Sequence, residues 1–65
     1  MERLEQILNK DKRAIISQLP KEEQEIAEEL FRKKVERYEV EGHTKNDSLY
    51  RGVRYLVLVY RNVLK

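Results

Sequence analysis

The chain has no cysteine and no tryptophan, and only one histidine, one proline and two glycines occur among its 65 residues. Without cysteine, neither a disulfide nor a zinc–thiolate site can form. A single histidine argues equally against a histidine-rich metal centre, so we predict neither a metal nor a cofactor. A chain of this length buries a small core, which disulfides, metals or oligomerisation usually reinforce. Of these, only oligomerisation remains, and a well-packed helical monomer is the alternative.

Long apolar runs are also missing from the sequence. No run reaches the roughly 18 to 20 apolar residues that a membrane-spanning helix needs. The start of the chain, MERLEQIL, is charged throughout and is unlike a secretory signal. We therefore expect one domain over residues 1–65 that does not engage a membrane and that lies in the cytoplasm.

Charge is what the sequence has in abundance, and its two signs are unevenly placed. Residues 20–42 carry five basic and eight acidic side chains, a net charge of −3, whereas residues 43–65 carry five basic and one acidic, a net charge of +4. A negative middle and a positive end can pair within a helical bundle or between subunits. Alternatively, they leave a basic surface free to bind an acidic partner.

Apolar residues recur with helical periodicity in three segments, which Pro20 and the turn-forming sequence GHTKNDS at 42–48 separate. The first segment, about residues 2–18, has the polar centre NKDK. It is either one continuous helix, which we favour, or two short helices of which Asp11 caps the second. The second segment, residues 21–41, starts with Pro20 in its first turn and stops at Gly42.

The third segment predicts a helix over residues 49–64, capped by Asp47 or Ser48. A competing interpretation is a strand at VRYLVLVY, residues 53–60, which would have to pair across a dimer. The cap, the length and the apolar spacing favour the helix. We therefore predict an all-α, three-helix protein, in which the second and third helices form a hairpin and the N-terminal helix packs across it.

The last helix has more apolar surface than a monomer of this size can cover, so we predict a homodimer that associates through it as a larger helical bundle. Gly52 beside this surface indicates a close approach of another helix, or a glycine that is merely tolerated. The residues predicted to form the core or the dimer contact are Val53, Leu56, Val57, Tyr60, Val63 and Leu64.

The other side of the last helix is cationic, with Tyr55 and Leu58 among its basic residues. These residues are either solvated charges that pair with the acidic middle segment, or a surface that recognises an acidic partner. Tyr55 beside arginines is also suited to stacking on a nucleic-acid base. The candidate recognition surface comprises Arg51, Arg54, Tyr55, Leu58, Arg61 and Lys65.

No catalytic pattern accompanies these surfaces. His43, Asp47 and Ser48 have the residue types of a catalytic triad, but nearness in a loop does not set their orientation. We expect His43 to be an ordinary exposed loop residue. The function predicted is therefore a non-enzymatic protein–protein interaction module, a small adaptor or regulator that acts as a homodimer on another protein. The alternative is a small nucleic-acid-binding dimer whose arginines contact phosphates.

Overall fold

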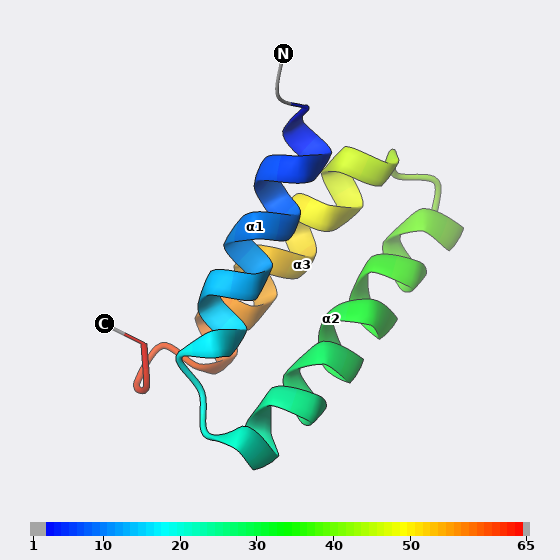
Figure 1. Ribbon diagram of the computed structural model, residues 1–65. Coiled ribbons are helices and arrows are strands. Elements are labelled where there is room, and N and C mark those ends of the chain that lie inside the picture. The colour runs from blue at the N-terminus through cyan, green and yellow to red at the C-terminus, as the bar shows by residue number, and fades with distance from the viewer. Residues whose placement is uncertain (1–2, 65) are drawn as a thin grey trace.

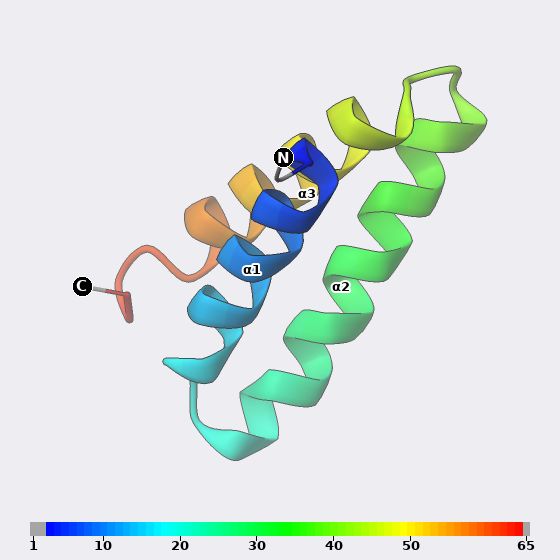
Figure 2. The same cartoon turned by 45° about the horizontal axis from the view of Figure 1, so that its top comes forward.

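The computed structural model describes residues 3–64 and contains three α-helices in that range: α1 (Leu4–Ser17), α2 (Lys21–Val40) and α3 (Lys45–Val59). Helices α1 and α3 run in the same direction and α2 runs in the opposite one (Figures 1 and 2). Helix α3 packs against both of the others, whereas α1 and α2 barely touch each other. The all-α prediction is confirmed, and the strand interpretation of residues 53–60 is wrong.

Helix α1 is continuous through its polar centre, as favoured from the sequence. Leu8 and Ile16 are buried on its inner side. Between them, Lys12 turns inward: its ammonium lies 5.3 Å from the centre of the Phe31 ring and 3.1 Å from Glu28 Oε1. A long side chain can bury its methylene groups in this way while its charge stays paired, so the polar centre costs the helix little.

The prediction that Pro20 lies in the first turn of α2 is wrong by one residue, because the helix begins at Lys21. Pro20 has a ψ of 153°, which is extended rather than helical, so it is the N-cap residue and Lys21 opens the helix. The other end agrees with the sequence. Gly42 has a φ of 104°, a conformation that favours glycine, and the chain leaves α2 there.

Helix α3 begins four residues before the predicted start and ends five residues before the predicted end. Thr44 is the cap, because its Oγ1 accepts a hydrogen bond from the Asp47 amide at 3.1 Å. Asp47 and Ser48 therefore lie inside the helix, which corrects the predicted cap. At the other end, the Tyr60 carbonyl accepts bonds from the amides of Val63 and Leu64 at 2.9 and 3.0 Å. This turn brings Leu64 back against the core.

The core lies where α3 meets the other two helices. Gly52 allows the closest approach: a Cβ at this position would lie 2.9 Å from both Phe31 Cε1 and Val35 Cγ2. The interpretation of Gly52 as a site of close helix packing is therefore right. The buried hydrophobic residues are Leu8, Ile16, Leu19, Ala27, Phe31, Leu49, Leu56 and Tyr60.

Candidate functional site

The predicted core or dimer face of α3 divides into two sets in the structure. Leu56 is completely buried and Tyr60 is 8% exposed, so both belong to the monomer core. Val53 and Leu64 pack at the edge of that core. The remaining two, Val57 and Val63, keep roughly half of their surface in contact with solvent, so only part of the face is used within one chain.

Large apolar side chains stay exposed along α3 and the turn that follows it. Tyr50 is 49% exposed, Val57 42%, Leu58 58% and Val63 48%. Residues three, four and seven apart lie on one side of a helix. Tyr50, half-buried Val53 and Val57 therefore form a continuous line, which we name the apolar stripe.

Beside the apolar stripe, a cleft of about 170 Å³ opens between α2 and α3. Its walls combine apolar, aromatic and cationic groups, which is the composition of many protein-binding surfaces. Four of its residues were predicted as recognition residues from the sequence, and the fifth comes from α2. We name it the tyrosine cleft, and it is lined by Tyr38, Arg51, Arg54, Tyr55 and Leu58.

Tyr38 is the cleft residue that the sequence analysis missed. It lies near the end of α2, six residues before Thr44, and Arg51 lies in the second turn of α3, seven residues after Thr44. An antiparallel hairpin places such positions side by side, and the Arg51 guanidinium indeed lies 5.4 Å from the centre of the Tyr38 ring. The register of the hairpin was the available signal.

A small polar cluster holds Arg51 in place. Arg51 Nε donates a hydrogen bond to Asp47 Oδ2 at 3.0 Å, and His43 Nδ1 lies 2.6 Å from the same oxygen. The hydrogen bonds from Arg51 and then His43 hold the pKa of Asp47 below its usual value. The His43 ring also meets the Tyr38 ring edge-on, with 5.2 Å between the centroids. The expectation of an ordinary exposed histidine is wrong, because Tyr38 and Asp47 cover two sides of the ring.

Cations also lie over the tyrosine rings. Lys34 Nζ is 4.4 Å from the centre of the Tyr55 ring and 5.9 Å from that of Tyr38. Arg54 lies 5.9 Å from the centre of the Tyr50 ring. Such contacts stabilise exposed sites by roughly 0.5 to 1 kcal/mol each. They hold positive charge at the rim of the tyrosine cleft. Lys34 was not among the predicted recognition residues.

Of the two remaining predicted recognition residues, Arg61 is not part of the cleft lining. Arg61 is exposed in the turn after α3. Lys65 falls outside the described residues. The structure therefore brings together four of the six predicted recognition residues and adds Tyr38 and Lys34 from α2.

The triad residue types do not assemble into a nucleophile with its base. His43 contacts Asp47, but the Ser48 hydroxyl is completely buried and has no hydrogen-bond partner among the described residues. Within residues 3–64, no group of three or more histidine, aspartate or glutamate side chains is placed to hold a metal ion. None of the helices in that range combines the length and apolar character needed to cross a bilayer.

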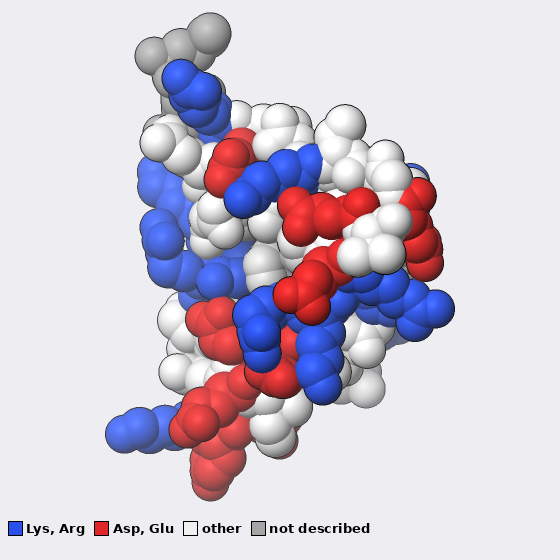
Figure 3. Space-filling model, turned by 90° about the vertical axis from the view of Figure 1, so that its right-hand side faces the viewer, with Lys and Arg blue, Asp and Glu red and all other residues white. Residues whose placement is uncertain are grey.

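The side of the molecule formed by α2 carries both signs of charge, interleaved (Figure 3). Ion pairs within the helix account for this pattern: Glu29 pairs with Arg32 at 2.6 Å and with Lys33 at 3.6 Å. The basic residues of this side are therefore largely neutralised locally. The tyrosine cleft and the apolar stripe lie away from the α1–α2 side and differ from it in chemistry, because they expose aromatic and aliphatic groups.

Comparison with known proteins gives no match: no family model, no curated protein and no solved structure is similar to this chain.

Proposed function

We propose that this chain is a non-enzymatic protein–protein interaction module, a small adaptor or regulator that works as a homodimer. The observation that supports this most is the exposure of Tyr50, Val57, Leu58 and Val63 on a small protein whose core is complete without them. Contiguous exposed apolar surface on a soluble domain marks an interaction site or an aggregation hazard. Here the apolar groups alternate with arginines, which keep such a surface soluble until a partner covers it.

In this proposal the apolar stripe forms the dimer contact. Tyr50, Val53 and Val57 have the i, i+3, i+7 spacing by which one helix packs along another. A two-fold axis would place the stripe of one copy on the stripe of the second, which is the commonest symmetry of soluble assemblies. Leu56 and Tyr60, predicted to form either the core or the dimer contact, belong to the monomer core.

The tyrosine cleft would then recognise the partner protein. Leu58 and the Tyr55 ring offer an apolar contact, while Arg54 and Lys34 carry positive charge at the rim. Tyrosine and arginine are enriched among the residues that dominate binding energy at protein interfaces. This combination fits a segment that presents one apolar side chain next to carboxylates.

The dimer contact is tested by light scattering on the V57E and V40E variants. Val57 is 42% exposed on the apolar stripe, and Val40 is 84% exposed at the end of α2, so both tolerate a glutamate without loss of core packing. We expect a dimeric mass for the wild type and V40E, and a monomeric mass for V57E. A wild type that is monomeric over the whole accessible concentration range would contradict the homodimer.

The nucleic-acid alternative has one observation in its favour, the Tyr55 ring with Lys34 above it and Arg54 in the same cleft. Against it stands Asp47, whose carboxylate neutralises Arg51 at 3.0 Å. A DNA duplex should therefore leave the scattering mass unchanged at low salt. A mass that rises with DNA, falls back at high salt and no longer rises in an Arg54→Glu, Arg61→Glu variant would establish phosphate binding instead.

A further inference from the structure

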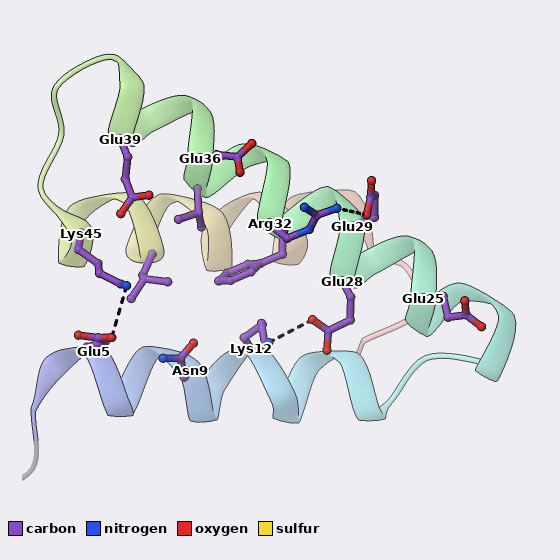
Figure 4. Close-up of a pocket in the computed structure, with 13 residues that line it drawn as sticks. Glu5, Asn9, Lys12, Glu25, Glu28, Glu29, Arg32, Glu36, Glu39 and Lys45 are labelled. Atoms are coloured by element: carbon purple, nitrogen blue, oxygen red, sulfur yellow. Dashed lines mark hydrogen bonds and ion pairs between the residues drawn. The ribbon is translucent and has the colours of Figure 1, made fainter.

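A second surface lies between α1 and α2, where these helices barely touch. A groove of about 610 Å³ runs between them, with α3 behind it (Figure 4). Phe31, Val35 and Leu49 form its apolar floor. Grooves of this volume lie within the range of roughly 300 to 1,000 Å³ that is typical of binding sites. We name it the acidic groove for the side chains along its rim.

The rim of the acidic groove carries six glutamates against three cations. Each cation is already paired with a glutamate of the rim, at N–O distances of 2.6 to 3.9 Å. The other three glutamates form no ion pair among the described residues, and Figure 4 shows them on α2 along the length of the groove. The paired residues are Lys12 with Glu28, Arg32 with Glu29, and Lys45 with Glu5; the glutamates without a pair are Glu25, Glu36 and Glu39.

Lys12 shows what kind of group this groove accepts. Its side chain is only 18% exposed, its ammonium lies 5.3 Å from the centre of the Phe31 ring, and its Nζ is 3.1 Å from Glu28 Oε1. The methylene groups thus cover the apolar floor while the charge reaches the rim. A lysine or arginine from outside would likewise lay its methylene groups against Val35 and bring its charge to Glu36 or Glu39.

We propose that the acidic groove docks a cationic amphipathic helix of a partner protein. Because α1 and α2 stand apart with α3 behind them, a helix laid between them would contact all three and complete a four-helix arrangement. Its apolar side would cover Phe31 and Val35, and its lysines or arginines would pair with Glu25, Glu36 and Glu39. Recognition of a helix by an apolar groove is a recurrent mode of binding, and complementary charge sets its specificity.

The probe for this proposal is a synthetic helical peptide of leucine and lysine with apolar residues at helical spacing, whose binding is followed by fluorescence anisotropy. The E39K variant reverses the charge of a groove glutamate that forms no ion pair with any described residue. The D11K variant is its matched control, since it makes the same charge change at an exposed site of α1 outside the groove. We expect E39K to weaken binding by roughly tenfold and D11K by less than about twofold.

Two further measurements separate the groove from general attraction between opposite charges. A K12A variant should bind the peptide a few-fold more tightly, because it uncovers Phe31 and frees Glu28; R13A, on the same helix, should not. A leucine–glutamate peptide of the same pattern, which the tyrosine cleft is proposed to accept, should bind the wild type and E39K alike. Equal weakening of leucine–lysine binding by E39K and D11K, or leucine–glutamate binding that E39K tightens more than D11K does, would overturn the proposal.

Light scattering on the E39K variant shows whether the acidic groove is filled by a partner protein or by a second copy of the chain. If E39K also converts a dimer to a monomer, a second copy of the chain fills the groove and the assignment to a foreign helix is wrong. The proposal does not rest on the tyrosine cleft or the apolar stripe. The V57E variant should therefore retain peptide binding even where it loses the dimer, so failure of one proposal is distinguishable from failure of the other.

Discussion

Replacing Gly52 by alanine tests how closely α2 and α3 pack. Gly52 lies in the interior of α3, where alanine is favoured over glycine by about 1 kcal/mol through helix propensity. At this position, however, the new Cβ would lie 2.9 Å from Phe31 Cε1, 2.9 Å from Val35 Cγ2 and 3.1 Å from Phe31 Cδ1. The ring is buried and the valine is branched at Cβ, so neither side chain can move aside easily.

Overpacking of this kind costs roughly 1 to 3 kcal/mol, which outweighs the gain in propensity. We expect G52A to lower the free energy of unfolding by about 1 kcal/mol, or the midpoint of thermal unfolding by roughly 4 to 8 °C for a domain of this size. Urea unfolding followed by circular dichroism measures this. The protein concentration is kept constant, because association adds to apparent stability.

A double mutant identifies the cause of the loss. In the V35A background the Cγ2 atom that obstructs residue 52 is gone, so the alanine at 52 should cost less there than in the wild type. We expect a coupling free energy of about 1 kcal/mol between the two substitutions. A G52A variant as stable as the wild type, or strict additivity with V35A, would refute the reasoning that a steric approach holds α2 on α3.

Three further substitutions test local features of α3. S48A should raise the free energy of unfolding by about 1 kcal/mol, because it removes a buried hydroxyl that has no partner within residues 3–64; a lower thermal midpoint would contradict this. T44A should lower it by about 1 kcal/mol through loss of the cap, and T44S should restore most of that in the same melting experiment. The hydrogen bond from Arg51 lowers the pKa of Asp47 in the folded protein. This hydrogen bond therefore stabilises the fold above the unfolded pKa near 4, and the stabilisation is lost as the pH falls through the pKa of folded Asp47. An acid titration of D47N should therefore show a smaller loss of stability below pH 4 than the wild type, and identical titrations would refute the assignment.

The number, order and type of the helices were predictable because each signal was local. Pro20 and Gly42 bound the second helix with residues that few backbone conformations suit, and the periodicity between them is too long for a strand. The shorter apolar run at residues 53–60 left a strand open, and there the length of the whole segment and its cap favoured the helix. The ends of α3 were not predictable in the same way. Thr44, Asp47 and Ser48 are all capping residue types, and only the three-dimensional hydrogen bond selects Thr44.

The end of α3 shows a different limit. Tyr60, Val63 and Leu64 continue the i, i+3, i+4 spacing of the helix before them, so the sequence predicts that the helix continues. A tight turn keeps the same spacing, because the amides of Val63 and Leu64 bond to the Tyr60 carbonyl just as helical residues would. Periodicity therefore located the apolar residues correctly and their backbone conformation incorrectly.

The acidic groove could not be predicted from the sequence, because it depends on a distance between two helices. Glutamates at helical spacing have the same pattern whether they face solvent or a groove. What opens the groove is the position of α3, which α2 approaches closely at Gly52 and to which α1 attaches, leaving α1 and α2 apart. The inward turn of Lys12 across the floor of the groove is likewise a tertiary feature.

The position of α3 also places the two proposed binding surfaces back to back. Lys45 and Leu49 line the acidic groove, whereas Arg54 and Leu58 line the tyrosine cleft. Each pair is separated by nine residues, which is two and a half turns of an α-helix, so the side chains project in opposite directions. One helix thus presents an acidic groove on one side and a cationic cleft on the other.

Two partners of opposite charge could therefore bind at once without competing for the same atoms, as an adaptor requires. This makes a measurable prediction: saturation with the leucine–lysine peptide should leave the dimer mass unchanged apart from the added peptide. The physical reason is that the peptide would cover Phe31 and Val35, whereas the proposed dimer contact uses the exposed Tyr50 and Val57. Dissociation of the dimer by the peptide in light scattering would show instead that the groove and the apolar stripe belong to one interface, and that the chain binds its partners in alternation.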